Sequence, residues 1–241
     1  MQAQARYLPV VEVPDMKKRS YEQNCTLALA LDVIGDRWTL LIVRELLLGP
    51  KRYSELLKGL RGMGTNLLAD RLKHLEEIGI VQRADGDEEA SVKGYRLSAT
   101  GQGLEEVVFA IVRWGAQMPF KFREGALSNP EWDIVAMRAL FQPEHAADVD
   151  EIYQFEIEGF SYFVHVCNRE IAIRTGVAEV PNLTVKTDRT TLSEMGRGAS
   201  ITEALSEGRL ALEGSPHSAE RMVSIFSRSQ AGHSQQDMRP A

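Results

Sequence analysis

The 241-residue sequence has no long hydrophobic run and very little cysteine. Its longest unbroken apolar run is the six residues 107–112, far short of the roughly 20 that cross a bilayer. The first residues, MQAQARYLPVVEVPD, lack the cationic start and apolar core of a secretory signal. Two cysteines, Cys25 and Cys167, are too few for a disulfide framework and fit a reducing compartment. We therefore expect a cytoplasmic chain with no membrane partner.

Motifs of the common enzyme and metal-binding classes are also missing. The sequence has no Cys-x-x-Cys, no His-x-x-x-His, and no glycine-rich phosphate loop between a strand and a helix. Its five histidines show no ligand spacing. Glu156, Glu158 and His165 lie on one predicted strand pair, where alternation divides them between two faces. We therefore expect no enzyme activity, no metal and no cofactor.

A net charge of −6 argues against a nucleic-acid partner when taken as an average, but the charge is unevenly distributed. Residues 1–119 hold 16 basic and 16 acidic side chains, whereas residues 120–241 hold 12 and 18. Within the first part, residues 16–73 carry 11 basic and 6 acidic side chains. The local field decides whether a phosphate backbone is attracted, so this basic block keeps DNA binding open.

Apolar residues at helical spacing predict four helices in the first half, over 24–35, 38–49, 52–60 and 66–77. Ser54 is a candidate cap for the third helix. In the fourth, Leu68, Leu72 and Leu75 form one apolar stripe, and the opposite face is polar. Two such helices joined by the short glycine-containing link RGMGT are typical of a helix-turn-helix.

Two β-prone runs, IVQR and GYRLS, follow this motif and are separated by the charged stretch ADGDEEASVK. This arrangement predicts a two-stranded wing. The next stretch, SATGQGLEEVVFAIVRWGAQM, predicts one long helix over 100–118, with Ser98 as its cap and Thr100 as the alternative.

The second half has a different pattern. Three runs of period two within IYQFEIEGFSYFVHVCNREIAIRTG are interrupted at residues 158–159 and 168–169, which predicts an antiparallel meander. NLTVKTD and RLALEG predict two further strands, and three helices are expected in TTLSEMGRG, SITEALSEG and HSAERMVSIF. The polar tail from Ser229 is expected to be disordered, and residues 1–15 are an uncertain arm.

The first half resembles the winged helix-turn-helix domain of HxlR-type bacterial transcriptional regulators over about residues 20–118. The resemblance rests on a cysteine before the first helix and on the stretches GDRWT, LLLGPKRYSEL and TNLLADRLKHLEEIGIV. It implies a sequence-specific DNA-binding regulator with double-stranded DNA as its partner. Repression is expected rather than activation, because steric occupancy of a promoter requires no further contact.

A helix in the major groove reads base edges with outward side chains near its N-terminus. Asn66 suits adenine, and Arg71 suits guanine or a phosphate, although Arg71 has the alternative of bridging to Glu55 or Glu76. Lys73 beside His74 has the alternative of a solvated face. The full set of expected DNA-binding residues is Arg52, Tyr53, Ser54, Thr65, Asn66, Asp70, Arg71, Lys73 and Lys93.

In the HxlR-type family the first helix and the long helix after the wing build a homodimer. The resemblance therefore implies a dimer here, and its expected interface residues are Leu27, Leu31, Val108, Ile111 and Trp114. Some HxlR-type relatives sense oxidants, quinones or aldehydes through a cysteine at the place of Cys25. Lys17, Lys18 and Arg19 and a helix N-terminus would lower the thiol pKa, whereas the alternative is a small buried hydrophobe.

The second half resembles the sterol-carrier-like fold through LTVKTDRTTLSEM, SITEALSEGRLALEG and the helix after SPHSAERM. That fold implies an apolar cavity for a hydrophobic small-molecule effector. Its candidate lining residues are Phe155, Ile157, Tyr162, Val164, Ile171 and Ile173. The same residues would equally suit a filled core, in which case this domain is only a dimer or partner surface, and a lipid-carrier-like binding protein is a further alternative.

The sequence thus predicts an α+β fold class with two domains. A winged helix-turn-helix domain is expected at 16–118, a linker at 119–128, and an α/β domain with an antiparallel sheet at 129–228.

Overall fold

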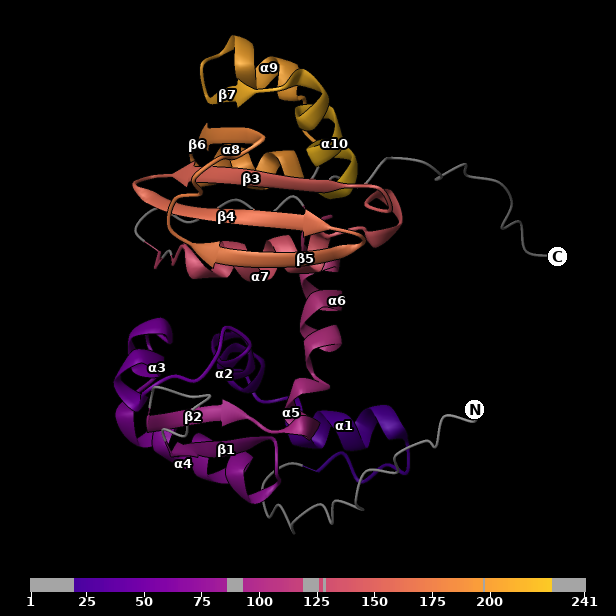
Figure 1. The fold of residues 1–241 in the computed structure, drawn as a ribbon. Helices are drawn as coiled ribbons and strands as arrows, with labels where there is room; N and C mark the ends of the chain where they lie inside the picture. The colour runs from indigo at the N-terminus through magenta and orange to yellow at the C-terminus, as the bar shows by residue number, and fades with distance from the viewer. Residues whose placement is uncertain (1–19, 86–92, 119–125, 128, 197, 227–241) are drawn as a thin grey trace, which may run out of the picture. The chain divides into compact units, whose positions relative to one another are not determined.

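The computed structural model describes residues 20–85, 93–118, 126–127, 129–196 and 198–226. The chain divides into two compact units, residues 1–110 and 111–241 (Figure 1). Within the described ranges, no helix combines the length and the apolar character needed to cross a membrane. The predicted arm at 1–15 and the tail from Ser229 lie outside these ranges, and the predicted domain boundaries stay predictions.

The first unit is built from helices and one two-stranded sheet. Its elements are α1 (Thr26–Ile34), α2 (Thr39–Leu46), α3 (Tyr53–Gly59), α4 (Thr65–Glu77), β1 (Val81–Asp85), β2 (Lys93–Leu97), α5 (Ala99–Gln102) and the first part of α6 (Glu105–Gly115). The four predicted helices and the wing strands are therefore confirmed. Ser54 is not the cap of α3, because the helix begins at Tyr53 and Arg52 is its N-cap.

Helix α4 forms because one stripe of leucines is removed from water. Leu68, Leu72 and Leu75 are at most 1% exposed, and each such burial contributes about 1.5–3 kcal/mol. They pack in a core with fully buried side chains of α2 and α3, among them Ile42 and Leu56. The helix ends at Glu77. Gly79 then has a positive φ of 71°, which glycine adopts without strain, and the first wing strand follows.

The wing pairs with the chain that precedes α3. Strands β1 and β2 are antiparallel, and Lys51 adds a bridge in which its N–H and C=O both bond to Tyr95 at 3.0 and 2.9 Å. A Cβ at Gly94 would lie 2.3 Å from the carbonyl oxygen of Lys51, so only glycine permits this approach. The wing is therefore tied to the helix-turn-helix through its backbone.

The single long helix predicted for 100–118 is wrong, because α5 and α6 are separate. Ser98 caps α5 by accepting a hydrogen bond from the N–H of Gly101 at 3.0 Å, as expected. Gly101 lies so close to Ile80 that a Cβ would be 2.1 Å from its carbonyl oxygen. Gly103 then ends the short helix, because two glycines within three residues weaken helix propagation.

In its described residues, the second unit places the end of α6, four further α-helices and five strands around its own core. After α6 come α7 (Glu131–Leu140), the 3-10 turn η1 (Pro143–His145), β3 (Asp150–Ile157), β4 (Phe160–Cys167), β5 (Glu170–Thr175), β6 (Leu183–Thr187), α8 (Arg189–Gly196), α9 (Ile201–Ser206), β7 (Leu210–Gly214) and α10 (Pro216–Phe226). The predicted meander and the two later strands are confirmed.

The sheet has the strand order β5-β4-β3-β6-β7 and is mixed rather than antiparallel throughout, since β3 and β6 run parallel. The two hairpins of the meander turn at the predicted breaks, where residues 158–159 and 168–169 all have positive φ. Two consecutive positive φ values are typical of type I′ turns, whose twist suits adjacent strands.

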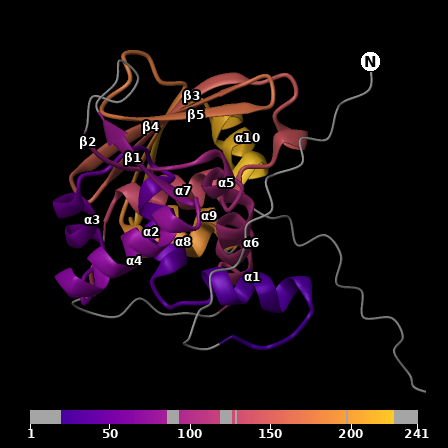
Figure 2. The ribbon, with the colours of Figure 1, turned by 90° about the horizontal axis from the view of Figure 1, so that it is seen from below.

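One face of the sheet is covered by helices, and Figure 2 shows α7, α8, α9 and α10 on the same side. Alternate residues of β3 and β4 point to that side and are almost fully buried, including Phe155, Tyr162 and Val164. The opposite face carries the intervening residues, such as Glu156, His165 and Lys186.

Candidate functional site

The outward face of α4 carries the side chains that the sequence assigns to DNA. Asn66, Asp70 and Lys73 fall within about 60° of one another on a helical wheel, opposite the buried leucines. All three are exposed, and so is Thr65 at the first helical position. Lys73 lies 3.8 Å from Glu77 in an exposed pair of little energetic value. The face therefore offers an amide, a carboxylate and an ammonium at one side of the helix.

Tyr53 positions the start of α4 by a direct hydrogen bond. Its hydroxyl donates to the backbone carbonyl of Thr65 at 2.6 Å. A phenol has one hydrogen to donate and a phosphate can only accept, so this bond occupies the donor that a phosphate contact would need. Arg52 and Ser54 are exposed beside it, and the N–H of Arg52 donates to Glu55 at 2.6 Å.

Arg71 is anchored within the unit rather than projecting freely. Its Nη2 lies 2.7 Å from Asp36 Oδ2, and its side chain is 23% exposed. The other oxygen of Asp36 accepts from the N–H of Trp38 at 2.9 Å. Arg71 therefore links α4 to the turn between α1 and α2, and its partner is neither Glu55 nor Glu76, the two predicted alternatives.

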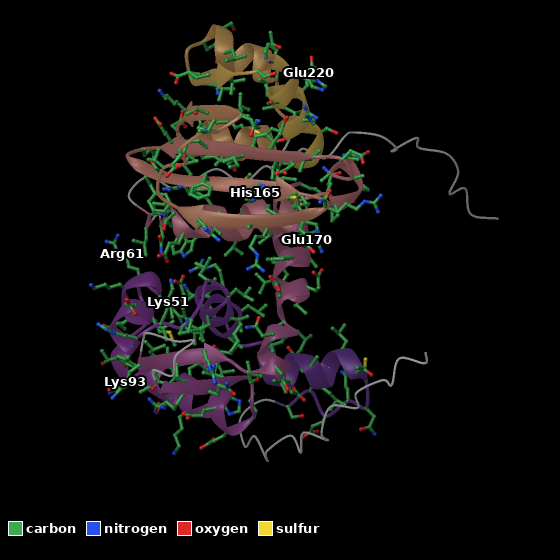
Figure 3. The ribbon with its side chains drawn as sticks, viewed as in Figure 1. Lys51, Arg61, Lys93, His165, Glu170 and Glu220 are labelled. Atoms are coloured by element: carbon green, nitrogen blue, oxygen red, sulfur yellow. The ribbon has the colours of Figure 1, made fainter. Side chains whose placement is uncertain are left out.

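Lys93 is exposed at the start of β2, beside a shallow hollow between α3 and the wing. Tyr53 and Arg83 also line this hollow. Arg83 stacks over the Tyr95 ring at 4.3 Å and lies 3.3 Å from Glu76. Figure 3 shows Lys93 on the wing and Arg61 in the turn between α3 and α4.

Sequence reasoning missed Arg61 and Arg83 as candidate phosphate contacts. Arg61 is exposed in the tight turn of the helix-turn-helix motif, and the side chain of Arg83 is 57% exposed. Arg61 could have been predicted as a phosphate contact, because it is the first residue of the RGMGT link between the two helices. Arg83 could be found only with the strand pairing that places it opposite Tyr95.

The expected dimer residues divide into exposed and buried side chains. Leu27 and Leu31 on α1 are 67% and 37% exposed, and Ile111 and Trp114 on α6 are 48% and 58% exposed. Val108 is 6% exposed and packs inside its own unit, so it offers no surface to a partner. Both helices thus present apolar side chains to solvent, which exposed surfaces of monomers rarely concentrate.

Cys25 occupies the N-cap position of α1 and is exposed. The backbone N–H of Ala28, followed by that of Leu27, lowers the pKa of its thiol. The alternative of a small buried hydrophobe is therefore wrong for this residue. Lys17, Lys18 and Arg19 lie outside the described residues.

The second unit contains an apolar cavity of about 390 Å³ on the helix-covered side of its sheet. The volume lies in the lower part of the range for small-molecule pockets, roughly 300–1,000 Å³. Its apolar lining residues are Val112, Ala116, Leu127, Trp132, Ala136, Met137, Leu140, Phe155, Leu192, Met195, Met222, Val223 and Phe226. Three methionines in this set give the wall an adaptable shape.

One end of the cavity is polar. Asp133 and Arg189 line it and are paired at 3.1 Å, and Arg189 lies 3.5 Å from Glu158. Burial raises the pKa of Asp133, and the positive charge of Arg189 opposes that rise. The hydroxyl of Tyr162 is buried near this pair, and no described residue forms a hydrogen bond with it.

Of the six predicted pocket residues, only Phe155 lines this cavity. Tyr162 stacks on Phe155 at 5.1 Å and belongs to the packed layer beneath the cavity. The remaining four, Ile157, Val164, Ile171 and Ile173, fill or flank the core of the sheet. The cavity walls come mainly from α6, α7, α8 and α10, because strand side chains are covered wherever the helices pack closely.

Comparisons with known proteins find one family for each half of the chain. Residues 33–121 match the model of the HxlR-like helix-turn-helix family, and residues 138–227 match that of the SCP-2 sterol transfer family. The solved structure of palmitated SCP2L2 from Aedes aegypti is 18% identical and covers 36% of this chain and 81% of its own, with a TM-score of 0.31.

Two bacterial relatives resemble the first unit. The uncharacterised HTH-type transcriptional regulator Mb3122 of Mycobacterium bovis is 32% identical over 48% of this chain and 68% of its own length. The HTH-type transcriptional regulator YodB of Bacillus subtilis is 34% identical over 36% of this chain and 79% of its own. The winged-helix geometry, the family match and these relatives agree, and the chain belongs to the HxlR-like helix-turn-helix family.

Proposed function

We propose that the protein is a dimeric transcriptional regulator that reads DNA with α4 and responds to a hydrophobic molecule bound in its second unit. The observation that carries the first part is the outward face of α4, where Asn66 and Asp70 stand exposed opposite a buried leucine stripe. Asn pairs bidentately with adenine, and Asp accepts from the amino group of cytosine. This role requires no catalysis, so the protein is proposed to act without enzyme activity.

Phosphate contacts complete this interface. Arg52, Ser54 and Arg61 are exposed around the two helices, and Lys93 is exposed on the wing. Tyr53 and Arg71 serve as positioning residues, since each already bonds within the unit. Arg71 retains further guanidinium donors for a phosphate. A dimer through the apolar surfaces of α1 and α6 would present two copies of α4 to a palindromic operator, and repression by promoter occupancy is the simplest outcome.

Asn66→Ala is expected to lower affinity for the selected operator by about 1–3 kcal/mol per half-site, because a bidentate contact to one base is lost. The measurement is a titration of the full chain against pooled genomic fragments, followed by binding to the selected fragment at two salt concentrations. Asn24→Ala, at an exposed asparagine before α1, is the matched control and should bind as the wild type does.

Arg61→Ala separates base reading from phosphate contact in the same assay. It should weaken binding to all fragments alike and reduce the salt slope by about one per half-site. Weak, unselective binding that is equal in Asn66→Ala would overturn the reading role of α4. If hydrophobic ligands still bound in that case, a lipid-carrier-like function would become the better account.

The polar end of the cavity favours a ligand with a neutral polar group. Arg189 is flanked by the carboxylates of Asp133 and Glu158, so a ligand carboxylate would add a third negative group around one guanidinium. A ligand hydroxyl can instead accept a hydrogen bond from Arg189, which lines the cavity. We therefore favour a long-chain alcohol or sterol-like molecule over a fatty acid. Such a ligand can change the affinity for DNA only by the ratio of its own affinities for two conformations of the dimer.

A second candidate is an electrophile sensor, favoured by the exposed Cys25 thiol with its lowered pKa. In this case the second unit would serve as a dimer or partner surface. Alkylation by iodoacetamide should reach half its maximal rate below pH 9.0, the ordinary thiol pKa, and should weaken operator binding at least tenfold, about 1.4 kcal/mol. Cys25→Ser should abolish both effects and Cys167→Ser neither. Unchanged DNA affinity after complete labelling of Cys25 would exclude this candidate.

A further inference from the structure

Three side chains of different chemistry meet on the face of the sheet opposite the helices. Asp150 lies on β3 directly opposite Cys167 of β4, and His165 stands two residues before Cys167 on the same face. His165 Nε2 is 2.7 Å from Asp150 Oδ1. One ligand atom from each of the three residues lies within 4.8 Å of the other two.

This set of atoms matches the donors that zinc prefers. Zinc binds thiolate sulfur, imidazole nitrogen and carboxylate oxygen at about 2.0–2.3 Å, and a tetrahedral ion separates such atoms by about 3.3–3.8 Å. The separation of 2.7 Å between Asp150 and His165 lies below that range, and the separations from Cys167 Sγ are at most 4.8 Å. Rotations about the side-chain bonds of Asp150 and Cys167 can adjust these separations, because both residues lie on the face of the sheet opposite the helices.

The backbone that carries the three residues is fixed by the adjoining hairpin. Asn168 and Arg169 turn with positive φ values of 49° and 68°, and their N–H groups donate to the carbonyls of Val149 and Ala146 at 3.0 and 2.9 Å. The Asn168 side-chain amide also lies 3.5 Å from Cys167 Sγ, where it can support a thiolate.

Glu170 neighbours this cluster by strand register, and its carboxylate is not among the three ligand groups that lie within 4.8 Å of one another. It is the first residue of β5 and pairs in register with Cys167, on the side away from Asp150 (Figure 3). A fourth ligand can therefore come from this carboxylate or from water. Three protein ligands with one exchangeable position are typical of open zinc sites.

We propose that Asp150, His165 and Cys167 bind a divalent transition metal ion of the zinc type. The sequence-based expectation of no metal depended on the spacing of histidines and cysteines along the chain. That spacing cannot reveal a set of ligands divided between two paired strands. The site lies on the opposite face of the sheet from the cavity, so it does not depend on the proposed small-molecule ligand or on DNA binding.

Cobalt(II) added to the reduced full-length protein tests this site directly. We expect a near-ultraviolet thiolate-to-cobalt charge-transfer band that one equivalent of zinc removes. Cys167→Ser should abolish the band, and His165→Gln should weaken cobalt binding at least tenfold. Cys25→Ser and His217→Gln are matched controls, since both residues are exposed elsewhere in the chain, and each should retain the band.

The proposal would be overturned if no charge-transfer band formed. It would equally be overturned if Cys167→Ser kept the band or if Cys25→Ser lost it. Circular dichroism of each variant establishes that it is folded, so that loss of the band reports loss of a ligand.

Discussion

Lys51→Met is expected to lower the free energy of unfolding by about 2–3 kcal/mol, because it removes a cation from a fully buried carboxylate. The Glu45 side chain has no exposed surface and lies 2.9 Å from Lys51 and 2.7 Å from Arg44. Arg44 remains in the variant, which keeps the loss below that of a completely unpaired charge. Since Lys51 also bridges to the wing at Tyr95, the variant should loosen helix-turn-helix and wing together. A urea titration followed by circular dichroism measures the change.

The pH dependence of stability distinguishes this cause from a simple packing defect. Burial raises the pKa of Glu45, but the hydrogen bond from Lys51 and the charge of Arg44 outweigh burial and hold the pKa below its ordinary 4.5. The wild type therefore has the full contribution above pH 4.5 and loses it as the pH falls through the lowered pKa. Lys51→Met removes the largest of the interactions that lower this pKa and leaves the burial in place, so we expect the variant to lose less stability than the wild type as the pH falls from 7 through 4.5.

Lys73→Met is the matched control, because Lys73 is 77% exposed and pairs only with exposed Glu77 among the described residues. It should change stability by no more than about 0.5 kcal/mol. A Lys51→Met variant with the stability and pH slope of the wild type would show that the buried carboxylate does not depend on Lys51.

Local periodicity was sufficient to predict most elements of both units. The leucine stripe of α4, the wing strands and the three-stranded meander each repeat within a few residues, and burial of one face imposes that period. The turn at 168–169 was predictable for the same reason, because it interrupts two alternating strands. The paired glycines Gly101 and Gly103 were also visible, but their effect depends on the close approach of Ile80, which no local pattern encodes.

The features that could not be predicted from the sequence depend on contacts between residues far apart in the chain. Arg71 and Asp36 are 35 residues apart, so only the packed unit reveals that a candidate base reader is an anchor. The parallel pairing of β3 with β6 requires a connection across the sheet, whereas the antiparallel pairs follow from short turns. Asp150, His165 and Cys167 likewise become neighbours only through strand register.

The cavity could not be derived from the pattern of apolar residues, because a filled core and a hollow one share the same composition. Its walls depend on how closely α7, α8 and α10 approach the sheet. Phe155 lines the cavity, whereas Val164 on the adjacent strand is fully buried and does not reach it. A substitution that fills this space without touching the sheet is therefore the direct test of its use.

Ala136→Trp is expected to abolish ligand binding in the second unit, because the indole would occupy the cavity that Ala136 lines on α7. A ligand at about 100 times its dissociation constant stabilises the wild type by about 2.7 kcal/mol, and this gain should vanish in the variant. The measurement is the rise in unfolding temperature of the full chain with hexadecanol and, separately, with palmitate. We expect a larger rise in unfolding temperature with hexadecanol than with palmitate, because palmitate would bring a third carboxylate to Arg189.

Ala172→Trp is the matched control, since Ala172 is exposed on β5 beside His165, on the face away from the cavity. It should retain the full ligand-induced rise, and Trp132 fluorescence should respond to hexadecanol in the wild type because that ring lines the cavity. An equal rise in Ala136→Trp would mean that apolar molecules bind elsewhere. No rise in the wild type would leave the second unit as a dimer or partner surface, and the regulator would then depend on Cys25 or on DNA alone.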